Sequence, residues 1–81
     1  MDIDPGATLE QLYKTLSRRH TFVLEAVPAT MNDERGYLGV SRGVYFRVWF
    51  DTERDSKTLF SSMRRAPALE RFAALKKQYG T

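Results

Sequence analysis

The chain contains no cysteine and a single histidine, His20. Without cysteine it cannot form a disulfide scaffold, a thiolate zinc site or a cysteine-nucleophile enzyme. No apolar run approaches the roughly 20 residues that a membrane-spanning helix requires. The start of the chain, with Asp2 and Asp4, lacks the apolar region of a signal peptide. We therefore expect a cytoplasmic protein with no membrane segment, no metal ion and no small-molecule cofactor.

The length and the distribution of charge limit the fold and the partners. A chain of 81 residues predicts one domain over 1–81, with residues 1–7 as a short leader that ends near a Pro5-Gly6 break. The net charge of +3 is uneven, because residues 1–17 are acidic overall and residues 56–81 carry six basic residues against Glu70 alone. A basic C-terminal third favours an anionic partner.

Helical patterns occur at both ends of the chain. Thr8 begins a capping box, followed by an apolar stripe with helical spacing. A short helix is predicted to begin at Asp55 or Ser56 and to hold Leu59, Phe60 and Met63. A last helix is predicted over 67–79, with Pro67 in its first turn. Its inner stripe is expected to contain Leu69, Phe72, Ala73 and Tyr79, with Leu75 near the edge.

Strand patterns occupy the middle of the chain. Residues 20–28 alternate and are predicted to form a strand that ends at Pro28. Residues 37–43 contain Gly39 and Gly43, and they are either a short middle strand or the bulged start of a longer one. Residues 44–51 alternate most regularly, with one apolar face and one mixed face. The apolar face holds Val44, Phe46, Val48 and Phe50, and the mixed face holds Tyr45, Arg47 and Trp49.

These patterns predict an α+β fold in the order α-β-(β)-β-α-α. Consecutive strands joined by short polar turns favour an antiparallel sheet of two or three strands. The helices need an apolar surface, and the Phe46 face of the sheet offers one. We therefore expect a small two-layer sandwich with helices on one face and the other face open.

The open face would carry the strongest candidate binding surface, the row Tyr45, Arg47 and Trp49. Exposed aromatic rings beside an arginine are typical of platforms for single-stranded nucleic acid, where rings stack on bases and the guanidinium contacts phosphate. The same residue types are enriched at protein–protein hot spots. The alternative is that a loop or residues 1–7 cover the row, which would then form a second small core.

Basic residues form the second candidate surface, which would attract phosphates through counterion release. The alternative is an ordinary solvated helix face whose cations suit the helix dipole. The candidates are Arg18, Arg19, Arg42, Arg64, Arg65, Arg71, Lys76 and Lys77.

Two further features do not predict chemistry. The acidic run 51–55 could hold a hard cation, but Ser56 and Ser62 stand where a calcium loop of the EF-hand type needs Gly and Glu. Helix capping explains the run better. His20 could act as a base with Glu25 or an aspartate, yet no nucleophile motif accompanies it. We therefore predict no catalytic residue and no enzymatic activity.

The sequence thus favours a small binding module whose partner is nucleic acid, with single strands preferred. The alternative is a protein-interaction module, such as a phage-type stoichiometric inhibitor or adaptor of a host complex. A homodimer through the open face is a variant of that alternative. The solvent exposure of Trp49 is the observation that tests the main candidate surface.

Overall fold

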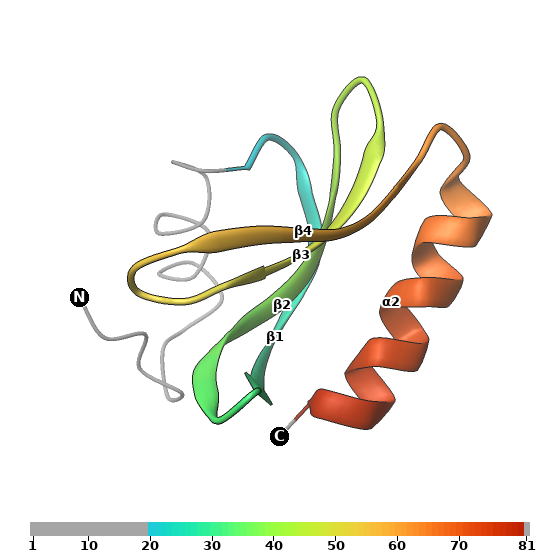
Figure 1. The fold of residues 1–81 in the computed structure, drawn as a ribbon. Coiled ribbons are helices and arrows are strands. Elements are labelled where there is room, and N and C mark those ends of the chain that lie inside the picture. The colour runs from blue at the N-terminus through green and yellow to red at the C-terminus, as the bar shows by residue number, and fades with distance from the viewer. Residues whose placement is uncertain (1–19, 81) are drawn as a thin grey trace.

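The computed structural model describes residues 20–80, which form a four-stranded antiparallel sheet and one helix (Figure 1). The strands are β1 (Val23–Met31), β2 (Glu34–Arg42), β3 (Phe46–Asp51) and β4 (Ser56–Ser62), and they lie in the order β1-β2-β3-β4. The helix α2 (Arg65–Tyr79) packs across one face of the sheet. The predicted α+β class is confirmed, whereas the leader and the helix predicted from Thr8 lie outside the described residues.

The alternation of β3 positions the main core as predicted. Phe46, Val48 and Phe50 face α2, and Val48 is fully buried. Val44 does not belong to this face, because β3 begins at Phe46 and Val44 lies in the preceding turn, 83% exposed. The buried members of the core are Ala29, Leu38, Val40, Val48, Phe50, Ala68 and Phe72.

The helix α2 begins two residues before the predicted start, with Pro67 in its first turn. Phe72 is buried as predicted, and Leu69, Leu75 and Tyr79 pack against the core from its margin. Ala73 was predicted to face inward but is exposed. The buried alanine of the helix is Ala68, which lies one turn before Phe72.

The strand β1 continues through Pro28 to Met31, so the predicted end at the proline is wrong. β1 is an edge strand of the sheet, where a proline can lie without removing a hydrogen bond of the ladder. Asn32 and Asp33 both have positive φ, 52° and 64°, as a two-residue hairpin turn with the twist of the sheet requires. This tight turn leads directly into β2, which is a full strand of nine residues.

The strand β4 replaces the short helix that was predicted after Asp55. It pairs with β3 along its length, with a register shift that leaves Leu59 as an extra residue between Thr58 and Phe60. The shift allows Leu59 and Phe60, adjacent in sequence, both to pack against the core. Three apolar residues at helical spacing are too few to nucleate a helix against this pairing.

Gly39 is needed where β2 passes Trp49 of β3. A Cβ atom at Gly39 would overlap the indole ring. We expect Gly39→Ala to lower the free energy of unfolding by about 1–3 kcal/mol, the usual cost of overpacking. Urea denaturation measures this loss. Gly43→Ala is the control, because its Cβ would meet only ordinary contacts. Equal stability of the two variants would contradict the close packing of Gly39 against Trp49.

Candidate functional site

Trp49 is buried, which corrects the prediction that it forms an exposed platform. The side chain has no solvent exposure, and its Nε1 donates a hydrogen bond of 3.2 Å to Ser41 Oγ. The indole stacks on the His20 ring with centroids 3.8 Å apart and planes inclined by 6°. With Tyr37, Trp49 forms a second small core on the face of the sheet opposite α2. The Tyr45, Arg47 and Trp49 row is therefore not one exposed surface.

A buried polar chain, Arg47–His20–Asp51, lies beside this indole. His20 Nε2 lies 2.7 Å from Asp51 Oδ2, and both side chains are 1% exposed. Arg47 Nη2 donates to His20 Nδ1 over 3.0 Å. Since a guanidinium can only donate, Nδ1 is an acceptor, and Nε2 carries the proton that is donated to Asp51. The contacts therefore describe a neutral His20 held between a cation and an anion.

His20 is fully engaged within this buried polar chain and is not placed to act as a base. Both ring nitrogens of His20 are engaged, and the ring is closed off from solvent. A general base needs an available nitrogen within hydrogen-bond reach of a substrate proton. Asp51 belongs to the acidic run 51–55 for which helix capping was the favoured explanation, and it instead accepts hydrogen bonds from His20 and from the Ser56 hydroxyl. Among residues 20–80, no three metal-ligating side chains gather at one point.

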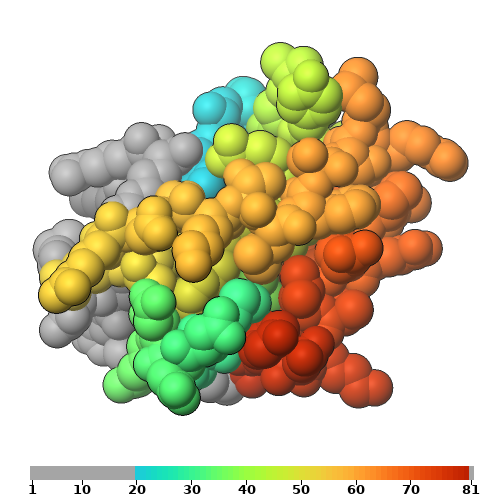
Figure 2. Space-filling model, viewed as in Figure 1, coloured from blue at the N-terminus to red at the C-terminus, as the bar shows by residue number. Residues whose placement is uncertain are grey.

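Three segments distant in sequence meet at one end of the sheet (Figure 1). The backbone N–H of Arg42 donates to the Phe22 carbonyl over 3.0 Å, and the Arg42 guanidinium lies 5.7 Å from the centre of the Phe22 ring. Phe46 pairs with Ser62, which places Met63 next to the hairpin that joins β2 to β3. Figure 2 shows the three segments as neighbouring parts of the same surface. We call this surface the basic end: Phe22, Arg42, Val44, Tyr45, Met63, Arg64 and Arg65.

The basic end combines apolar side chains with positive charge. Phe22 and Met63 are each 68% exposed, Val44 is 83% exposed and Tyr45 is 51% exposed. No acidic residue occurs in the segments 20–24, 41–48 and 59–69 that build it. Contiguous apolar side chains exposed in this way mark interaction sites.

The backbone of Phe22 supports the same interpretation. Its φ of 51° lies in the left-handed region, which is unusual for a bulky residue. Such strain persists only where the surroundings enforce it, and it is concentrated at functional sites. Here Arg42 holds the Phe22 carbonyl, and the ring is directed into solvent.

The other predicted basic residues are not gathered at this end. The Arg71 guanidinium covers the Phe60 ring at 4.6 Å. Lys76 forms an ion pair of 2.8 Å with Glu25 of β1, and Lys77 is exposed in the last turn of α2. Arg18 and Arg19 lie outside the described residues. Of the predicted basic side chains that the structure describes, only Arg42, Arg64 and Arg65 belong to the basic end.

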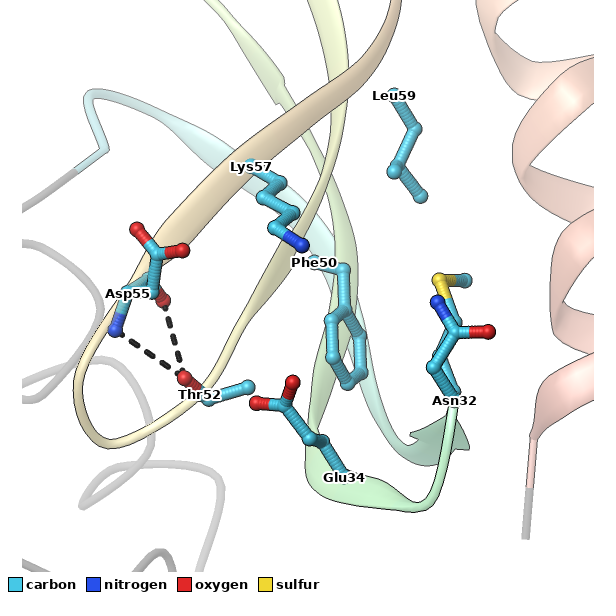
Figure 3. Close-up of a pocket in the computed structure, with 8 residues that line it drawn as sticks. Asn32, Glu34, Phe50, Thr52, Asp55, Lys57 and Leu59 are labelled. Carbon is cyan, nitrogen blue, oxygen red and sulfur yellow. Dashed lines mark hydrogen bonds between the residues drawn. The ribbon is translucent and has the colours of Figure 1, made fainter.

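Pockets occur at both ends of the sheet in the part of the chain that the structure describes. One, of about 300 Å³, adjoins the basic end and is lined by Thr21, Arg42, Tyr45 and Arg47, among others. The other, of about 100 Å³, lies at the opposite end of the sheet (Figure 3). In it, the Thr52 Oγ1 accepts from the Asp55 backbone N–H and closes the turn from β3 to β4. Glu34 and Lys57 give that smaller pocket mixed charge, and it offers no uniform electrostatic attraction.

Sequence reasoning missed three members of the basic end. Phe22 and Val44 were assigned to inward strand positions, and Met63 to a short helix. For Phe22 and Met63, the sequence pattern carries no sign that each lies just outside a strand. A signal did exist for Val44, because the glycine before it favours a hairpin turn.

The part of the chain that the structure describes contains no helix long and apolar enough to cross a membrane. Comparisons with protein-family models, with curated proteins and with solved structures found no match to this chain.

Proposed function

We propose that this protein is a non-enzymatic binding module that binds nucleic acid through the basic end. The observation that carries the proposal is the combination of two exposed aromatic rings, Phe22 and Tyr45, with exposed arginines, and the described segments that build that end contain no acid. Aromatic rings offer stacking surfaces to bases, while guanidinium groups bind phosphates. The candidate surface is thus the end of the sheet rather than the face that holds Trp49.

Single strands suit this surface better than a duplex. The base faces of a duplex are stacked on one another, so a protein ring can stack only on a base that is unpaired or displaced. Phe22 and Tyr45 are placed on turns at the end of the sheet, where an unpaired base can reach them. We therefore expect affinity for single strands to exceed affinity for a duplex of the same length.

Titration of a fluorescent single-stranded oligonucleotide at two salt concentrations tests the proposal. We expect Tyr45→Ala to weaken binding about tenfold, since stacking contributes about 1–3 kcal/mol per base. Arg42→Ala should reduce the slope of log affinity against log salt by about 0.7, one phosphate contact on a single strand.

Arg35→Ala is the matched control, because it removes one exposed arginine at the opposite hairpin, beyond Asn32 and Asp33. It should leave affinity nearly unchanged. No binding at low salt, or an equal loss in Arg35→Ala and Arg42→Ala, would refute binding at the basic end.

A second candidate is a protein-interaction module, such as a stoichiometric inhibitor or adaptor. Val44 and Met63 favour it, because aliphatic side chains exposed to this degree are more useful against an apolar protein surface than against bases. This function predicts that Val44→Asp abolishes capture of a protein partner while affinity for oligonucleotides remains near zero. A homodimer through the face opposite α2 loses its main predicted contact, because Trp49 is buried there.

A further inference from the structure

The pocket that adjoins the basic end has Arg47 as its most constrained cation. It has a volume of about 300 Å³ and is lined by Thr21, Arg42, Tyr45 and Arg47, among others. A volume of this size lies at the lower limit of pockets that hold small ligands. These four residues bring two guanidinium groups, an aliphatic hydroxyl and a phenol ring to the pocket.

Arg47 is held in place from behind. One of its Nη atoms donates to His20 Nδ1 over 3.0 Å, and His20 in turn lies 2.7 Å from Asp51. The His20 ring is stacked on the buried indole of Trp49. An arginine normally loses considerable side-chain entropy when it binds a ligand, and an arginine already fixed loses less.

Within residues 20–80, the Arg47 guanidinium has more hydrogen-bond donors than acceptors in contact with it. Its guanidinium has five N–H donors, and among residues 20–80 its hydrogen bond to a side chain is the one to His20. No carboxylate forms an ion pair with it in that part of the chain. The remaining edge of the guanidinium is suited to a ligand that accepts several hydrogen bonds in one plane.

The buried polar chain is better explained by this role than by stability. A buried ionic cluster is often no more stabilising than apolar residues of the same volume. In this fold the buried polar chain of side chains begins at Asp51, the last residue of β3, and ends at the Arg47 guanidinium, which lines a pocket. The contacts in this cluster fix the orientation of the Arg47 guanidinium, as a binding site for an anion requires.

We propose that this pocket binds one phosphate group of the nucleic acid, with Arg47 as the main contact, Arg42 at the rim and Thr21 as a hydroxyl donor. His20 and Asp51 are positioning residues that act through Arg47. The proposal rests on the function proposed above and specifies where a phosphate lies relative to the ring of Tyr45. The group could be an internal phosphodiester or a terminal phosphate monoester, which share the same acceptor oxygens.

Side-chain NMR of Arg47 in the full-length protein tests the pocket directly. We expect inorganic phosphate to shift the Arg47 Nε–H signal and to leave that of Arg54, exposed in the turn from β3 to β4, unchanged. Arg47→Gln should weaken oligonucleotide binding about tenfold, and Arg47→Lys should restore only part of it because a lysine is a point charge. Arg54→Gln is the matched control and should bind normally.

Two comparisons identify the phosphate and the positioning residue. Tighter binding of a 5′-phosphorylated oligonucleotide than of its 5′-hydroxyl form indicates a terminal monoester, and equal binding of the two indicates an internal phosphodiester. Rotation of the Arg47 guanidinium should be slow in the wild type and fast in His20→Ala. If His20 served only to stabilise the core, the rate of this rotation would be the same in both proteins.

The outcomes separate this inference from the proposed function. If phosphate leaves Arg47 unshifted and Arg47→Gln binds oligonucleotides as the wild type does, the pocket is refuted, while loss of binding in Tyr45→Ala would still support the basic end. If phosphate shifts Arg47 but no oligonucleotide binds at low salt, the anion pocket is supported and the nucleic-acid function is refuted. Far-UV circular dichroism shows whether each variant is folded, because the near-UV signal of Trp49 itself depends on the stacked His20 ring.

Discussion

Replacing Trp49 with alanine is expected to lower the free energy of unfolding by about 3–5 kcal/mol, the usual cost of removing a large buried aromatic residue. The side chain is fully buried, stacks on His20 and donates to Ser41. Domains are stable by only about 0.05–0.15 kcal/mol per residue. The loss therefore represents a large part of the stability of this chain, and urea denaturation followed by far-UV circular dichroism measures it.

Tyr45→Ala is the control for this variant, since it removes a neighbouring aromatic ring that is half exposed. It should change stability by less than about 1 kcal/mol, as surface substitutions usually do. Equal stability of Trp49→Ala and Tyr45→Ala would mean that the second small core does not stabilise the fold. Iodide quenching of the single tryptophan adds an independent check, because a buried indole should be shielded.

Replacing Asp51 with alanine is expected to cost about 3 kcal/mol. The carboxylate is 1% exposed and accepts hydrogen bonds from His20 and from Ser56. Hydrogen bonds to a charged group contribute about 1.5–3 kcal/mol each, and removal of one partner leaves buried donors without that acceptor. Thermal and urea unfolding both measure the loss.

Asp51→Asn should lose less than Asp51→Ala, because its amide oxygen can still accept from His20 Nε2. Glu34→Ala removes an exposed carboxylate at the start of β2 and should be nearly neutral. If Asp51→Ala were as stable as Glu34→Ala, the buried polar chain would not hold His20 and Arg47 in the way the distances imply.

The two kinds of variant divide the molecule into a stabilising part and a binding part. Trp49 and Asp51 lie in the interior, where substitutions should reduce stability. Tyr45 and Arg42 lie at the basic end, where substitutions should reduce affinity and leave stability nearly unchanged. Arg47 connects the two parts, because its contact with His20 is partly buried and its edge lines a pocket.

Strands and helices were predictable from the sequence where a pattern of apolar residues a few positions apart defines them. The alternation in 44–51 correctly separated Phe46, Val48 and Phe50 from Arg47 and Trp49. The last helix was recognisable from Pro67 and its apolar stripe. The segment after Asp55 was not, because the bulge in its pairing with β3 interrupts the alternation of apolar and polar residues.

Part of the basic end was also predictable. Arg42, Tyr45, Arg64 and Arg65 were candidates from charge and residue type alone. Phe22 and Met63 became visible only where the ends of β1 and β4 meet the hairpin between β2 and β3. The backbone hydrogen bond from Arg42 to Phe22 joins residues that are distant in sequence, so the spacing of residues along the chain does not predict it.

By itself, the sequence determined the α+β class, the antiparallel sheet and the face of β3 on which each side chain lies, because period-two and period-3.6 patterns follow from backbone geometry. Only the tertiary structure decided whether a face is covered. Periodicity indicates the direction of the Trp49 side chain but not its neighbours, and in the folded protein the buried indole contacts His20, Ser41 and Tyr37. The same folding leaves Phe22, Val44 and Met63 exposed, since each lies just outside a strand, in a turn at one end of the sheet.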